Sequence, residues 1–274
     1  RKTACRNRHN TSTINAAGEK MAKNIESFIN LNNEGSHYLI EGQVHCALDH
    51  FINAAEELQQ ILQESEFFQE TQKIETFSPY VPSVTNRIQR KHEEAVNLIG
   101  RNAQMCEEAI LPYHFISISV PNFQDDAFYV YDKVIMIPAD AMKHLTVHFD
   151  IKEFRFLCGA VMFNLALTHH WIGRNSSESQ ICSREALLCY ETALNQFQMC
   201  SDSGISNKNI LKLAVVAWNN ISHIQYKEEN YYHSQIAFKN ALAILANQTI
   251  PILDREIYIK LSLNSFTLHY PRTC

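Results

Sequence analysis

Two stretches of this chain repeat one pattern of small and aromatic residues. Residues 35–55 read GSHYLIEGQVHCALDHFINAA, and residues 222–242 read SHIQYKEENYYHSQIAFKNAL. Counted from its first small residue, each stretch has a small residue at step twelve, a phenylalanine at step sixteen and an alanine at step nineteen. The apolar residues between them recur at spacings of three and four. Each stretch therefore predicts two helices joined by a tight turn.

A third copy of the pattern lies between these two. Ala166 precedes Gly173 by seven residues, and after an eight-residue insertion over 174–181 the residues Ala186, Tyr190 and Ala193 repeat the second half of the pattern. A small residue on each helix lets the two backbones approach closely, and the aromatic residue fills the space one turn away. Because one helix pair cannot bury both of its faces, we expect the pairs to stack. The residues expected to make these packing contacts are Gly35, Tyr38, Ala47, Phe51, Ala54, Ala166, Ala186, Tyr190, Ala193, Trp218, Ser222, Phe238 and Ala241.

Periodicity predicts the other elements. We expect helices over about 19–41, 43–64, 84–110, 150–172, 183–200, 207–229 and 231–248, with a loop over 65–83. Residues 116–120 and 128–137 have the composition of two strands of a hairpin. An isolated hairpin is marginally stable, and residues 257–263 alternate apolar and polar side chains, so we expect the C-terminal segment to supply a third strand.

The predicted fold class is mainly α, with antiparallel helix-pair repeats and a small β-hairpin insertion. The chain then divides into a basic disordered tail (1–18), a first helix pair (19–64), an insert with a loop, a long helix and strands (65–150), two further helix pairs (151–250) and a C-terminal segment (251–274).

The three pairs resemble the tetratricopeptide repeat (TPR) family over roughly 28–61, 159–200 and 215–248, a little under half of the chain. The third copy departs from the family pattern at Ser222 and Ser234, where Gly or Ala is commoner. About 100 residues separate the first copy from the second, so the array is not a regular tandem. The resemblance implies a curved array whose first helices line a concave, partner-binding surface.

Asparagine and aromatic residues dominate the expected concave face. Asparagine side chains can hold the backbone of an extended peptide, while Trp171 and Tyr226 can bury an apolar anchor. The candidate binding residues are Asn32, Ser36, His170, Trp171, Asn219, His223, Tyr226 and Lys227. The alternative is that this face packs against the inserted 110–150 segment, an interpretation that we favour for Phe163 and Leu167. Chaperone-binding members of the family hold a C-terminal carboxylate with Lys, Arg and Asn, a set that is missing here.

Charge and composition narrow the function classes. The 24 Lys and Arg against 29 Asp and Glu give a formal charge of −5, and residues 1–24 are basic while the remainder is acidic. This balance disfavours nucleic acid as a main partner. No apolar run approaches the ~18 residues of a membrane span, and eight scattered cysteines suit a reducing compartment. We expect a cytoplasmic or nuclear protein, and organelle targeting by the basic N-terminus stays open.

Motifs of common enzyme classes are absent: the sequence has no GxGxxG, no Walker glycine loop, no GxSxG and no HExxH. We therefore expect a non-catalytic scaffold or adaptor without a cofactor, which binds another protein or a peptide segment. The alternatives are a metal-dependent enzyme that uses the histidines between His144 and His170, and an RNA-binding helical repeat.

Overall fold

The computed structural model describes residues 4–64, 116–120, 128–138, 151–175, 179–202, 208–246 and 255–269. Over these ranges the fold is mainly α. The helices are α1 (Ala4–Ile40), α2 (Val44–Glu64), α6 (Ile151–Asn175), α7 (Ser179–Asp202), α8 (Lys208–Lys227), α9 (Tyr231–Ala246) and α10 (Arg255–His269). Strands β1 (Ile116–Ser119) and β2 (Lys133–Met136) form an antiparallel pair in which Ile116 lies opposite Met136. None of the helices described is long and apolar enough to cross a membrane.

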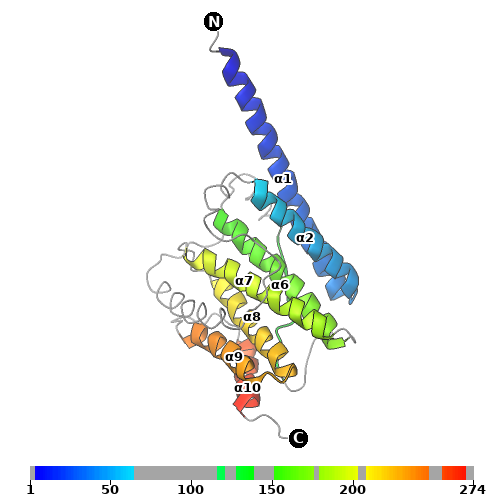
Figure 1. The fold of residues 1–274 in the computed structure, drawn as a ribbon, viewed down its shortest axis with the longest axis vertical. Coiled ribbons are helices and arrows are strands. Elements are labelled where there is room, and N and C mark those ends of the chain that lie inside the picture. Colours follow the sequence, from blue (N-terminus) through cyan, green and yellow to red (C-terminus); the bar gives the residue numbers. More distant parts are fainter. Residues whose placement is uncertain are drawn as a thin grey trace.

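The helices pack as neighbours in chain order. Helix α1 packs on α2, α6 on α7 and α8 on α9, while α2 also contacts α6 and α7 also contacts α8. Figure 1 shows α2, α6, α7, α8 and α9 side by side, with the first half of α1 projecting away from the others. The prediction of a mainly α fold with a small hairpin is confirmed.

Two turns have the same geometry at equivalent positions of the pattern. At the end of α1, Gly42 has a φ of +79°, and the N–H of Gln43 donates to the carbonyl of Tyr38 at 2.8 Å. At the end of α8, Glu229 has a φ of +60°, and the N–H of Asn230 donates to the carbonyl of Gln225 at 2.8 Å. A left-handed residue followed by this back-bond ends a helix and reverses the chain.

Small residues allow close helix crossings, as the pattern predicts. A Cβ atom on Gly35 would lie 3.0 Å from the ring of Phe51 on α2. At the α8–α9 crossing, the hydroxyl of Ser222 donates to the carbonyl of Ser234 at 2.9 Å, and the hydroxyl of Ser234 donates to the carbonyl of Ser222 at 2.7 Å. These serines therefore add reciprocal hydrogen bonds to the close approach.

The remaining packing residues, except Phe238, lie in or against one hydrophobic core that extends from α1 to α10. Tyr38 and Trp218 are partly buried against it, and the other expected packing side chains are buried. Ala47, Ala54, Ala166, Ala186, Tyr190 and Ala193 are completely buried, and Ala241 is 1% exposed. Phe238 belongs to a smaller cluster with Phe128 and Leu268.

The expected third strand is wrong, because residues 255–269 form helix α10. The spacing of apolar residues in this segment fits both the two-residue repeat of a strand and the repeat of a helix. Its period-two alternation predicts a strand, but Ile257, Leu261, Asn264 and Leu268 also recur at spacings of four and three, and these are the buried residues. The apolar residues Ile259 and Leu263, which completed the alternation, are exposed at 49% and 58%.

The N-terminus and the insertion also differ from expectation. Helix α1 begins at Ala4, so it includes residues 4–18, for which the sequence predicts a tail. Most of the insertion over 174–181 becomes extra helix, because α6 continues to Asn175 and α7 begins at Ser179. The loop expected over 65–83 and the helix expected over 84–110 lie outside the described residues.

The two turns make a matched pair for mutagenesis. Glu229→Gly should raise the free energy of unfolding by about 0.5–1 kcal/mol, because glycine relieves the left-handed conformation. Gly42→Ala should lower it by about 1 kcal/mol through the same conformation. A Cβ atom at Gly42 meets nothing within 4 Å, so no clash complicates the comparison. Urea denaturation would measure both, and equal effects of the two substitutions would contradict the prediction.

Candidate functional site

An extended segment of the chain, residues 128–138, crosses the first helices of the pairs; we call it the inner segment. Asn164 on α6 binds both backbone groups of Ile135: the N–H of Ile135 donates to Oδ1 at 2.8 Å, and Nδ2 donates to the carbonyl of Ile135 at 2.7 Å. Asn220 on α8 binds Tyr131 in the same way, at 2.8 and 2.9 Å. A carboxamide thus matches the donor and acceptor of one residue.

Two further asparagines repeat this arrangement at the ends of the inner segment. Asn33 on α1 accepts from the N–H of Ile137 at 2.9 Å and donates to its carbonyl at 2.7 Å. Asn264 on α10 accepts from the N–H of Tyr129 at 2.7 Å and donates to its carbonyl at 2.8 Å. We call the four residues Asn33, Asn164, Asn220 and Asn264 the asparagine clamps.

Neighbouring polar side chains support the clamps. Asn32 donates to the carbonyl of Ile135 at 3.1 Å and accepts from Asn164 at 2.9 Å. Asn219 donates to the carbonyl of Tyr129 at 3.0 Å and accepts from Asn264 at 2.7 Å. These amide–amide bonds fix the orientation of the clamps, because each Oδ1 and Nδ2 has a defined partner.

The clamps occupy the place of a neighbouring strand. The N–H of Val120 donates to the carbonyl of Asp132 at 2.7 Å, so the backbone N–H and carbonyl groups of residues 132, 134 and 136 point toward β1 and Val120. The clamped residues 129, 131, 135 and 137 are odd-numbered and face the opposite edge. Buried backbone groups need hydrogen-bond partners, and side chains from four helices supply them here.

The side chains of the inner segment are also held by the helices. Tyr131 is completely buried, with its ring centroid 6.0 Å from that of Phe163. Phe128 packs against His223 and Tyr226, with ring centroids at 5.4 and 5.7 Å. The predicted apolar anchor at Tyr226 therefore contacts a residue of the same chain.

A buried histidine pair lies beside the Asn220 clamp. Nε2 of His170 and Nδ1 of His223 are 2.8 Å apart, so one ring donates and the other accepts. Nδ1 of His170 lies 3.4 Å from the hydroxyl of Tyr190, which also accepts from Asn220 at 2.9 Å. Burial raises the pKa of Tyr190 and keeps its hydroxyl neutral. The pair is thereby linked to the clamp on Tyr131.

The structure brings most of the predicted binding residues together. Asn32, Ser36, Asn219, His170, His223 and Tyr226 all lie at or next to the inner segment. Trp171 is partly buried against the core, and Lys227 is exposed at the end of α8. The face thus packs against the insert, which is the alternative that we kept open.

The asparagine clamps were missed by the sequence interpretation, although a signal was present. Asn33, Asn164 and Asn220 each stand two positions before the small residue of the first helix, at Gly35, Ala166 and Ser222. The predicted concave face includes the positions three before that residue, Asn32 and Asn219, and positions after it such as Ser36 and His223, but not the clamp positions. Asn264 has no equivalent small residue to mark it.

The alternative of a metal-dependent enzyme finds no support among the described residues. No group of three or more His, Cys, Asp or Glu in this part of the chain could hold a metal ion. His144 and His148 lie outside the described residues. His169 is partly buried. Its burial lowers the pKa of the imidazole, and this effect outweighs the negative charge of Glu185, which raises that pKa.

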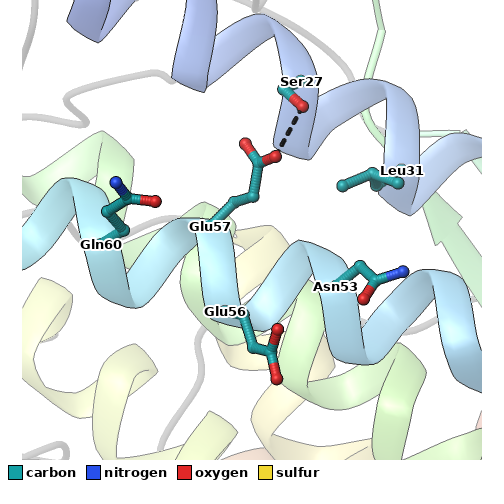
Figure 2. A pocket seen from close by; sticks show the side chains of 6 residues that line it. All are labelled: Ser27, Leu31, Asn53, Glu56, Glu57 and Gln60. Carbon is teal, nitrogen blue, oxygen red and sulfur yellow. Dashed lines mark hydrogen bonds between the residues drawn. The ribbon is translucent and has the colours of Figure 1, made fainter.

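A separate hollow of about 360 Å³ lies between α1 and α2. Figure 2 shows its lining of Ser27, Leu31, Asn53, Glu56, Glu57 and Gln60, with the Ser27 hydroxyl donating to Glu57 at 2.8 Å. None of these six residues belongs to the clamps, so the hollow is distinct from the surface that holds the inner segment.

Comparison with protein-family models, with curated proteins and with solved structures found no match for this chain.

Substitutions at Asn164 should separate the two halves of a clamp. Asn164→Ala should lower the free energy of unfolding by about 2–4 kcal/mol, because the N–H and carbonyl of Ile135 lose partners in a buried site. Asn164→Asp keeps the acceptor for the N–H but cannot donate to the carbonyl, and should also destabilise. Asn175→Ala, at an exposed asparagine on the same helix, is the control and should cost about 0.5 kcal/mol or less. Equal urea denaturation midpoints for Asn164→Ala and Asn175→Ala would refute the role of the clamp.

Glu191 on α7 should make stability depend on pH. Burial raises the pKa of its carboxyl from 4.5 to about 7. The folded protein then binds more protons than the unfolded chain between these values, so this group's contribution to stability falls as pH rises through that window. Glu191→Gln should gain about 1–3 kcal/mol over the wild type at pH 8 and nothing at pH 4. Thermal denaturation at the two pH values would test this, and a gain that is the same at both would contradict it.

Proposed function

We propose that the chain is a non-catalytic scaffold of TPR-like helix pairs that binds an extended segment of a partner protein along its first helices. The TPR resemblance rests on the repeated spacing of small and aromatic residues, which the close crossings at Gly35 and Ser222 support. The matching turns at Gly42 and Glu229 support it as well.

The observation that carries this proposal is the set of asparagine clamps. Each clamp binds the backbone of an extended peptide and makes no use of the side chain of the bound residue. Recognition of this kind resembles the addition of a strand to a sheet, where backbone hydrogen bonds give affinity and alternate side chains give specificity. A carboxamide does not titrate and is no nucleophile, so the chemistry of this surface suits binding.

The inner segment shows which ligand the surface accepts. It is extended, it offers four residues to the clamps, and its buried side chains are aromatic or aliphatic except for Asp132, which is 7% exposed. The proposed partner segment has these properties, and the same helices would hold it. Because two bidentate clamps contribute several kcal/mol, their loss should weaken partner binding by more than about tenfold.

Affinity purification from cells with three forms of the full chain tests this function. The wild type and the exposed control Asn175→Ala should recover the same proteins, and Asn164→Ala/Asn220→Ala should recover them at least about tenfold less. Circular dichroism checks that the double variant keeps its helices, and a single Asn219→Ala variant serves if it does not. Equal recovery by all forms would remove these clamps from partner binding.

A further inference from the structure

We propose that the inner segment is a releasable intramolecular ligand, which occupies the clamps until a partner segment of the same geometry displaces it. This inference rests on the proposed function and adds its regulation. Residues 128–138 would then act as an autoinhibitory strand.

The first argument is that the helices are packed without the inner segment. The described helices α1, α2, α6, α7, α8 and α9 each contact the next one in this order directly, and the backbone bonds of a helix are internal to it. The backbone of the inner segment is joined to the helices by asparagine side chains rather than by a shared backbone ladder, and its apolar side chains pack in the same core. Its departure would leave the helix pairs in contact.

The second argument is the distribution of the clamps. Tyr129 and Tyr131 are held at one end, and Ile135 and Ile137 are held at the other. Lys133, the odd-numbered residue between them, has no asparagine clamp among the described residues and lies opposite Ser119 in the register with β1. The asparagine bonds thus form two separate sets, while β1 and Val120 pair with residues 132–136 on the other edge, so the segment can open stepwise from its two ends.

The third argument defines the competitor. A partner must replace the apolar burial as well as the backbone bonds, since Phe128, Tyr131, Val134, Ile135 and Ile137 are all at most 1% exposed. It therefore needs an extended segment of about ten residues with aromatic residues near its start and branched aliphatic residues near its end. Because the inner segment is part of the same chain, its effective concentration at the clamps is on the order of mM. Ligands that bind the clamps weakly therefore cannot displace it.

Native-state hydrogen exchange on the wild-type full chain tests the proposal without a destabilising variant. Amides of Tyr129, Tyr131, Ile135 and Ile137 should show protection at least tenfold lower than core amides of α6 and α8, because the segment opens locally. Excess synthetic peptide FYVYDKVIMIP, flanked by two lysines at each end for solubility, should speed exchange in the native segment and leave α6 and α8 unchanged.

A matched peptide isolates the clamp chemistry. N-methylation at the positions of Tyr131 and Ile135 removes two clamped N–H groups but keeps every side chain, so this peptide should have no effect on exchange. Protection of the segment equal to that of α6 and α8 would overturn the proposal, as would exchange that the unmodified peptide does not change. Either result leaves the scaffold function standing if affinity purification still depends on the clamps.

Discussion

The structure depends on the requirement that buried backbone groups find hydrogen-bond partners. The inner segment lies among helices, which use their own backbone groups internally and have none to offer. Asparagine meets the requirement because its carboxamide carries one acceptor and one donor group at the spacing of a peptide unit. Four clamps from four helices therefore turn a helical surface into the equivalent of a strand, and β1 completes the other edge.

Helices and turns could be predicted from the sequence because local physics determines them. Apolar spacing located α2, α6, α7, α8 and α9 to within a few residues, and Gly42 marked a turn by its conformational freedom. The strand expected at residues 257–263 failed because its residues satisfy two periods, and only burial decides between them. The matching turn at Glu229 carries no glycine, so composition alone gave no sign of its left-handed backbone.

The clamps were harder to predict for a different reason. An asparagine within a helix has low intrinsic preference for it and no apolar signal, so periodicity treats it as a solvated residue. In fact Asn164 and Asn220 are completely buried. The role of each depends on the inner segment, which is distant in the sequence from both. Polar contacts at Ser222 and Ser234 have the same character: they specify how two surfaces meet, which no local pattern encodes.

The order of the clamps along the chain has a consequence for folding. The inner segment is synthesised after Asn33 but before the clamps on α6, α8 and α10, and the bond from Asn264 to Tyr129 spans 135 residues. Contacts at such separation form late and slow the approach to the native state. During synthesis on a ribosome, the apolar side chains of the inner segment stay incompletely covered until α10 has been synthesised. The nascent chain is therefore most vulnerable to aggregation between the synthesis of the inner segment and the synthesis of α10.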